Sequence, residues 1–268
     1  MDLHDRVYAR PEGSELLARV YRPALPGRLP VLVDVHGGGW NILDRTAGAH
    51  YDQALAAAGF LVVAVDFRMA PAHKHPTASA DVAQAVRWVH REAAELGADP
   101  ARIGVLGSSS GGHLALLAAL DLRTDPDVRV RCAMSLWAPV DPLARWRHAQ
   151  ERARHADPAI RDHGKLMLSA HRAYFGSEEL MEDASVTRRV AVEPGPLPPL
   201  LLVQAGRDDN VPASISEALL AAYRTAGGTV EHALFPEAAH GFACTPGADS
   251  ERCIEHMRNF ARRWLADD

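Results

Sequence analysis

The chain has 268 residues, a length that suits one large α/β domain. Hydrophobic residues make up 47% of it and charged residues 24%, which excludes a disordered or fibrous protein. The formal net charge of -5 argues against electrostatic binding of nucleic acid. Because no apolar run reaches the ~18 residues of a membrane-spanning helix, we expect neither nucleic acid nor a membrane among the partners.

The cysteines and the N-terminus favour a reducing compartment. Cys132, Cys244 and Cys253 are too few for a disulfide framework, so we expect free thiols. Residues 1–10 carry several charged side chains and lack the apolar core of an export signal, which favours the cytoplasm. No Cys or His spacing fits a metal site, and we expect no metal and no other cofactor.

Residues 7–10 and 16–21 flank a Pro-Glu-Gly-Ser turn and predict an antiparallel hairpin at a sheet edge. Beyond this hairpin, short β-branched apolar runs alternate with helical patterns. The predicted strands are residues 31–35, 60–65, 103–106, 132–137, 200–203 and 230–235. The predicted helices are residues 47–58, 79–96, 113–122, 213–225 and 254–265. This alternation predicts an α/β fold with a mostly parallel central sheet flanked by helices.

Residues 141–196 interrupt the alternation between the strands predicted at 132–137 and 200–203, because they are long, charged and helix-prone. A connection of this length in a compact domain usually folds on its own. We expect a cap insertion over the carboxyl ends of the strands, where open α/β sheets bind ligands. The alternative is a surface excursion without a substrate role. The whole chain, residues 1–268, is then one domain carrying this insertion.

The most informative motif is Gly107-Ser108-Ser109-Ser110-Gly111, which lies between a predicted strand and a predicted helix. A Gly-x-Ser-x-Gly turn in this setting is the nucleophile elbow, whose strained backbone lifts the central hydroxyl off the sheet. The motif predicts Ser109 as nucleophile and the backbone N–H of Ser110 as an oxyanion donor. An ordinary Gly/Ser turn is the alternative, since the pattern is short.

A serine nucleophile needs a general base, and the base needs an orienting carboxylate. With a nucleophile elbow, the carboxylate and then the His follow the serine along the chain, each after a strand. The next-to-last predicted strand is followed by Asp208 and Asp209, and the last by His240. We favour Asp208 as the acid, with Asp209 facing solvent or capping the next helix, but both remain open.

An oxyanion loop is predicted directly after the strand at 31–35. The segment His36-Gly37-Gly38-Gly39-Trp40 occupies this place. Its three glycines allow backbone N–H groups to turn toward a substrate oxygen without steric cost. His36 is expected to order the loop rather than to take part in chemistry.

Together these motifs resemble those of the hormone-sensitive-lipase-like esterases among the α/β-hydrolases. His36-Gly-Gly-Gly-Trp40 matches the oxyanion motif of that group, and His240-Gly-Phe242 matches its His turn. Residues 65–71 resemble its Val-Asp-Tyr-Arg-Leu-Ala-Pro stretch, and residues 107–112 resemble its Gly-Asp-Ser-Ala-Gly-Gly elbow. The resemblance extends from about residue 31 to the C-terminus. It implies the α/β-hydrolase fold, an oxyanion hole formed by the N–H groups of Gly38, Gly39 and Ser110, and Asp208 as the acid.

The chain also departs from the group's pattern. Ser108 and Ser110 replace the usual Asp and Ala of the elbow, and Ala72 replaces the Glu that usually follows Ala-Pro. These differences lean toward small carboxylesterases, acetyl-xylan or feruloyl-type esterases, or arylformamidase-like hydrolases. They leave the identity of the substrate open but do not change the predicted serine-hydrolase chemistry.

The sequence therefore predicts a serine carboxylesterase that cleaves small carboxylic esters through Ser109, His240, Asp208 and an acyl-enzyme. One alternative is an amide or formamide hydrolase with the same triad, and a less favoured one is a non-catalytic homologue that binds a ligand. The partner is a small-molecule ester, and an edge strand near Val230 allows a homodimer.

Trp40, beside the oxyanion loop, is a candidate substrate-binding residue. The aromatic residues Trp146, Tyr174 and Phe175 of the predicted cap are further candidates for the pocket wall. Packing inside the protein is the alternative for all of them.

Overall fold

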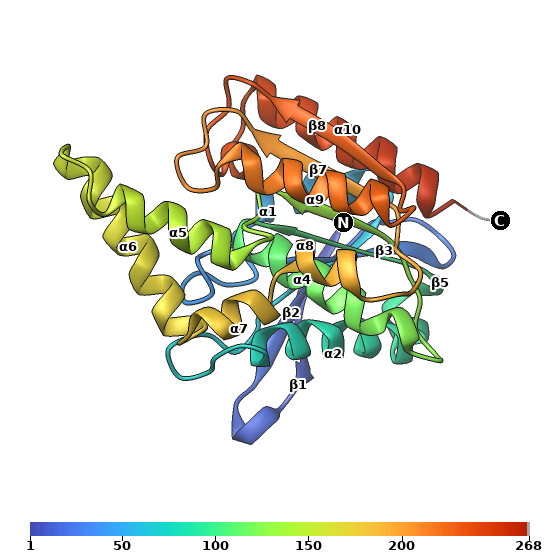
Figure 1. Cartoon of the computed structure of the whole chain (residues 1–268). Coiled ribbons are helices and arrows are strands. Elements are labelled where there is room, and N and C mark those ends of the chain that lie inside the picture. Colours follow the sequence, from blue (N-terminus) through green and yellow to red (C-terminus); the bar gives the residue numbers. More distant parts are fainter. Residues whose placement is uncertain (267–268) are drawn as a thin grey trace.

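The computed structural model describes residues 1–266, whose strands form one eight-stranded sheet (Figure 1). The strands are β1 (Asp2–Ala9), β2 (Leu16–Arg22), β3 (Leu29–Val35), β4 (Leu61–Val65), β5 (Ala98–Ser108), β6 (Val130–Leu136), β7 (Leu200–Ala205) and β8 (Val230–Phe235). Their spatial order is β1-β2-β4-β3-β5-β6-β7-β8. The pairs β1–β2 and β2–β4 are antiparallel, and the remaining pairs are parallel. The predicted sheet and its edge hairpin are confirmed.

Helices cover both faces of this sheet (Figure 1). They are α1 (Ala49–Ala57), α2 (Thr77–Arg91), α3 (Ala93–Leu96), α4 (Ser110–Asp121), α5 (Pro142–Arg152), α6 (Pro158–Tyr174), α7 (Glu178–Asp183), α8 (Val186–Val192), α9 (Ala213–Thr225) and α10 (Ala248–Trp264). Short 3-10 turns span Pro11–Gly13, Leu122–Thr124 and Phe242–Cys244. The helix predicted over residues 79–96 is divided into α2 and α3, because the backbone of Glu92 between them is not helical (φ -89°, ψ 13°).

The central strand β3 explains why the sequence shows continuous apolar runs instead of alternation. Val31 and Val33 belong to the apolar cluster that includes residues of α2, α4 and α9, whereas Leu32 belongs to the cluster that includes residues of α1 and α10. Because helices bury both faces of a parallel sheet, neither face of its strands presents polar side chains to solvent.

The parallel register brings the loops that carry the predicted site to one edge of the sheet. Val35 of β3 lies opposite Gly107 of β5, and Ala205 of β7 lies opposite Phe235 of β8. The loops after these strands therefore leave the sheet on the same side. At the lateral edge of the sheet, β8 is the outermost strand; pairing of two subunits there stays a prediction.

Residues 141–196 contain α5 to α8. Each of these helices begins at a polar residue whose side chain accepts a backbone N–H in the first turn; these residues are Asp141, Asp157, Ser177 and Ser185. Proline follows the cap in α5 and α6, where its fixed φ suits the first helical position. α5 and α6 pack against each other and project away from the sheet (Figure 1).

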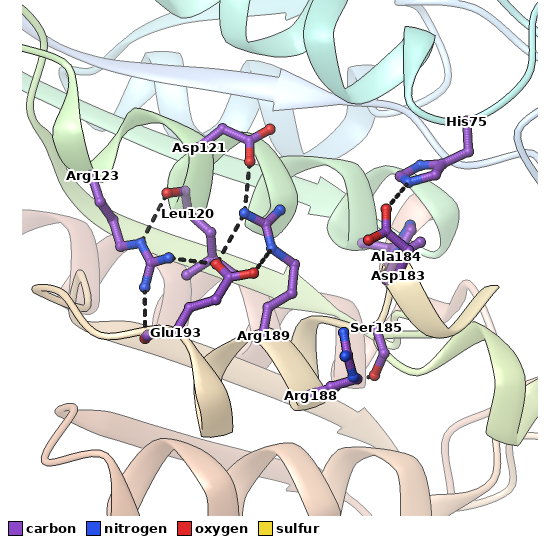
Figure 2. A network of polar contacts seen from close by, with 11 residues as sticks. His75, Leu120, Asp121, Arg123, Asp183, Ala184, Ser185, Arg188, Arg189 and Glu193 are labelled. Carbon is purple, nitrogen blue, oxygen red and sulfur yellow. Dashed lines mark hydrogen bonds and ion pairs between the residues drawn. The ribbon is translucent and has the colours of Figure 1, made fainter. Parts of the chain in front are cut away.

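The end of this segment is anchored to the core by a polar network (Figure 2). Arg123, just after α4, donates to Glu193 Oε2 at 2.7 Å, and Arg189 of α8 lies 2.9 Å from Asp121 Oδ1 at the end of α4. Arg189 also donates to Glu193. Several charges joined in one network stabilise more than an isolated surface pair. α8 is thereby held against the helix that begins at the Ser109 turn.

Candidate active site

Ser109 lies at the turn between β5 and α4 with φ 52° and ψ -127°, a backbone conformation that non-glycine residues rarely adopt. Its N–H donates to the carbonyl of Leu136 at 2.8 Å. The two glycines of the motif are required by close approach. A Cβ on Gly107 would lie 2.5 Å from the backbone of Gly111, and a Cβ on Gly111 would collide with the carbonyl of Val35.

Ser109, His240 and Asp208 form a continuous hydrogen-bonded chain. His240 Nε2 lies 2.9 Å from Ser109 Oγ, and His240 Nδ1 lies 2.8 Å from Asp208 Oδ2. The three residues come from the loops after β5, β7 and β8. When Nδ1–H donates to the carboxylate, Nε2 is free of a proton and accepts the serine hydroxyl. This geometry suits removal of the Ser109 proton.

The structure brings Asp208, and not Asp209, next to His240. The Asp208 side chain is 3% exposed, and its second oxygen accepts the N–H groups of Asn210 and Val211, both at 2.8 Å. These donors hold the carboxylate in place. The side chain of Asp209 is 84% exposed and lies 3.6 Å from Arg152.

The glycines predicted for the oxyanion hole line the cavity beside Ser109. Gly38 and Gly39 have φ values of 105° and 60°, which favour glycine. A Cβ on Gly38 would collide with the carbonyl of Ile42. The N–H groups of Asn41 and Ile42 donate to the Gly38 carbonyl and close the turn.

Ser110 makes a contact that the motif does not reveal. Its Oγ accepts the backbone N–H of Trp40 at 3.2 Å, which ties the glycine loop to the start of α4. His36 holds the other end of the loop, with its Nδ1 2.8 Å from the carbonyl of Gly37 and its ring stacked on Phe67. Burial lowers the pKa of His36, so the ring is neutral and orders the loop as expected.

The expectation that Trp40 binds substrate is wrong, because its side chain is fully buried (0% exposed). Its ring stacks on Tyr174 at 5.4 Å and meets Phe175 edge-on at 5.0 Å, and its Nε1 donates to His113. Tyr174, Phe175 and Trp146 are also buried and do not line the cavity. For these four aromatic residues, packing is the correct interpretation.

A cavity of about 650 Å³ opens over Ser109, a size typical of a small-molecule site. One wall comes from α5 and α6, which supply Arg145, His163, Leu166, Met167, Ser169 and Ala170. Trp137, which follows β6, forms another part of the wall. Arg145, Trp137 and Asn210 were not assigned to the site from the sequence. No motif marks Arg145 or Trp137, and Asn210 lies in the loop predicted to carry the acid without a role of its own.

Three further observations concern residues 1–266. Cys132, Cys244 and Cys253 are free thiols. No group of three or more His, Cys, Asp or Glu side chains in this part of the chain is placed to hold a metal ion. None of its helices has the length and apolarity needed to cross a membrane.

A family model described as alpha/beta hydrolase fold matches residues 32–244. The chain belongs to this family, and within it to the hormone-sensitive-lipase-like group that its motifs resemble. The carboxylesterase NlhH of Mycobacterium tuberculosis is 43% identical over 112 residues, which cover 40% of this chain and 34% of NlhH. The esterase LipC of the same organism is 31% identical over 260 residues, which cover 91% of this chain and 60% of LipC.

Among solved structures, EstE1, a thermophilic carboxylesterase cloned from a metagenomic library, superposes with a TM-score of 0.85 at 28% identity. The match covers 99% of this chain and 90% of EstE1. The chain thus spans between about a third and three fifths of the length of the first curated relatives and most of the length of this structural neighbour.

Proposed function

We propose that this protein is a serine carboxylesterase that cleaves small carboxylic esters. The hydrogen-bonded chain from Ser109 Oγ through His240 to Asp208 Oδ2, with distances of 2.9 and 2.8 Å, carries the proposal. The names of NlhH, LipC and EstE1 support an ester as substrate, rather than the amide or formamide that the same triad would cleave.

In the first half-reaction, Ser109 Oγ attacks the ester carbonyl while His240 Nε2 takes the serine proton. Asp208 holds the imidazole in the required tautomer and stabilises the imidazolium. The N–H groups of Gly38, Gly39 and Ser110 donate to the oxyanion of the tetrahedral intermediate. The intermediate collapses when His240 donates its proton to the departing alcohol oxygen, which leaves an acyl group on Ser109.

In the second half-reaction, His240 removes a proton from water, and the resulting hydroxide attacks the acyl-enzyme. Collapse of this second intermediate releases the carboxylic acid and returns the proton to Ser109. Residues 141–196 act as a cap, because α5 and α6 form one wall of the cavity in which both steps occur.

A fluorophosphonate probe tests the assignment, since it reacts with an activated serine. We expect the wild type to gain one label, and peptide mapping to locate it on Ser109 rather than on the adjacent Ser108 or Ser110. Ser109→Ala should lose both the label and the turnover of 4-nitrophenyl acetate while keeping the wild-type melting temperature. Equal labelling of the Ser109→Ala variant contradicts the proposal.

A further inference from the structure

Arg145 of α5 is a buried cation in the wall of the cavity. It is 6% exposed, and burial lowers its pKa to about 10, which leaves the guanidinium charged at neutral pH. Within residues 1–266, no carboxylate forms an ion pair with Arg145. Buried charges are usually paired, because an uncompensated one is costly. We therefore expect the anionic partner of Arg145 in a bound ligand rather than in the chain.

The contacts that hold Arg145 are all with uncharged groups. Nε donates to the carbonyl of Asn210 at 3.0 Å, Nη2 donates to the Asn210 side-chain oxygen, and Nη1 lies 3.2 Å from His171 Nδ1. The guanidinium carbon lies 5.9 Å from the centre of the Trp40 ring. Since each terminal nitrogen bears two N–H groups and makes one of these contacts, each keeps an N–H for a further acceptor.

The neighbours of Arg145 do not supply the missing negative charge. Burial and the nearby guanidinium lower the pKa of His171 to about 3, so its ring is neutral. Asp208 is the carboxylate that acts on Arg145 through space, but its oxygens already accept from His240, Asn210 and Val211. The triad thus uses the carboxylate that the guanidinium would otherwise pair with.

We propose that Arg145 is a specificity-determining residue that binds a carboxylate on the substrate, so that the preferred substrates are esters that also carry a carboxylate group. This inference rests on the esterase activity proposed above. A carboxylate has two oxygens, which match the N–H groups that remain on the two terminal nitrogens of an arginine.

The rest of the cavity suits the uncharged part of such a substrate. Ile42, Leu166 and Met167 line it, and Ile42 and Leu166 are 59% and 68% exposed, so apolar surface continues from the cavity to the protein exterior. An aliphatic or aromatic spacer between the ester and the carboxylate would contact these side chains. The combination of an apolar wall with one buried cation favours an amphiphilic acid ester over a neutral one.

Arg145 also holds Asn210, whose N–H donates to the triad carboxylate. A purely structural role in supporting this loop predicts that loss of Arg145 slows all esters equally. A role in substrate binding predicts a selective loss for anionic esters. The ratio of two kcat/KM values separates these roles, because damage to the triad cancels from it.

The test compares each carboxylate with its isosteric primary amide. One pair is 4-nitrophenyl hydrogen adipate and its amide, with the charge on the acyl side; the other is 4-acetoxybutanoate and 4-acetoxybutanamide, with the charge on the alcohol side. For the wild type we expect kcat/KM to favour the carboxylate by about 10- to 100-fold in one of the pairs, which is the range for a charged hydrogen bond.

Three variants complete the test. Arg145→Gln should abolish the preference, and Arg145→Lys, which keeps the charge without the planar fork, should retain part of it. Arg147→Gln is the matched control on the same helix. Arg147 is exposed and does not line the cavity, so the ratio should stay within about 2-fold of wild type. If Arg145→Gln does not fold, reduction of the ratio in Arg145→Lys replaces it.

The outcomes distinguish this inference from the proposed function. A wild type that is labelled by the fluorophosphonate but shows no carboxylate preference in either pair overturns the inference alone. A preference that persists in Arg145→Gln, or in Arg145→Lys at full size, overturns it as well. A wild type that is neither labelled nor active on any of the four esters overturns the proposed function together with the inference.

Discussion

Replacement of Asp34 by Asn should change how the stability of the protein depends on pH. Asp34 lies in β3 with 1% of its surface exposed, and its two oxygens lie 3.3 and 3.4 Å from the Tyr51 hydroxyl. Burial raises the pKa of this carboxyl from 3.8 to about 7. The folded state therefore holds a proton at Asp34 over a pH range in which the unfolded chain has released it.

The sign follows from proton linkage. Because the pKa is raised in the folded state, the stabilisation is complete below the unfolded value near 3.8 and is lost as pH rises through about 7. Between these two pKa values, each step of one pH unit costs about 1.36 kcal/mol for each proton released. The wild type should therefore lose on the order of 3 kcal/mol between pH 5 and pH 8 through Asp34, which interacts electrostatically with the buried carboxyl of Asp52. Asp34→Asn removes this loss, so its melting temperature relative to wild type should rise by roughly 5–10 °C over that range.

Thermal melts of both proteins at pH 5, 6, 7 and 8 provide the assay. The buried amide of Asn adds a penalty that does not vary with pH, so the informative quantity is the change in the difference between the two proteins. Asp209→Asn serves as the control, because its side chain is 84% exposed. Parallel pH profiles for Asp34→Asn and wild type would refute the reasoning that burial of Asp34 sets this pH dependence.

Three further predictions concern the site and its surroundings. Asp208→Asn should lower kcat on a 4-nitrophenyl ester by roughly 10⁴-fold because it disturbs the His240 tautomer. Asp209→Asn should change kcat by less than about 3-fold, and a larger loss in Asp209→Asn than in Asp208→Asn reverses the assignment of the acid. Ser110→Ala removes the acceptor of the Trp40 N–H, so kcat/KM should fall by about 3- to 10-fold, and an unchanged value means that the bond does not order the oxyanion loop. Trp40→Ala should lower the free energy of unfolding by about 3–5 kcal/mol, measured by urea denaturation, and a loss below about 1 kcal/mol contradicts its role in packing.

The fold could be predicted from the sequence because hydrophobic period and chain order carry it. Residues 213–225 and 230–235 are predicted with the bounds that the structure gives to α9 and β8. The three residues that meet in the site were also found, since the parallel topology requires Ser109, the acid and His240 to follow strands that end at one edge. For these three residues, the local motifs and their order along the chain were sufficient to predict the contact.

Residues whose positions depend on packing could not be predicted in this way. Trp40 follows the glycines that line the cavity, but the partners of its ring come from α4, from α6 and from Phe175, which follows α6. Arg145 lies in a charged segment that resembles a solvated helix face, and it donates hydrogen bonds to Asn210, 65 positions away. Asp34 lies within an apolar strand, and its side chain contacts Tyr51 of the helix α1, which covers this face of the sheet.

The burial of Trp40 has a consequence for substrate choice. Its backbone N–H donates to Ser110 Oγ, and its ring stacks on Tyr174 of α6, a helix that also supplies part of the cavity wall. The cavity wall that we propose to select the substrate and the loop predicted to stabilise its transition state are thus in direct contact. We therefore expect changes in α6 that admit a different substrate to shift this loop as well, so that specificity and rate would change together. A redesign of the cavity would have to select for substrate specificity and for turnover at the same time.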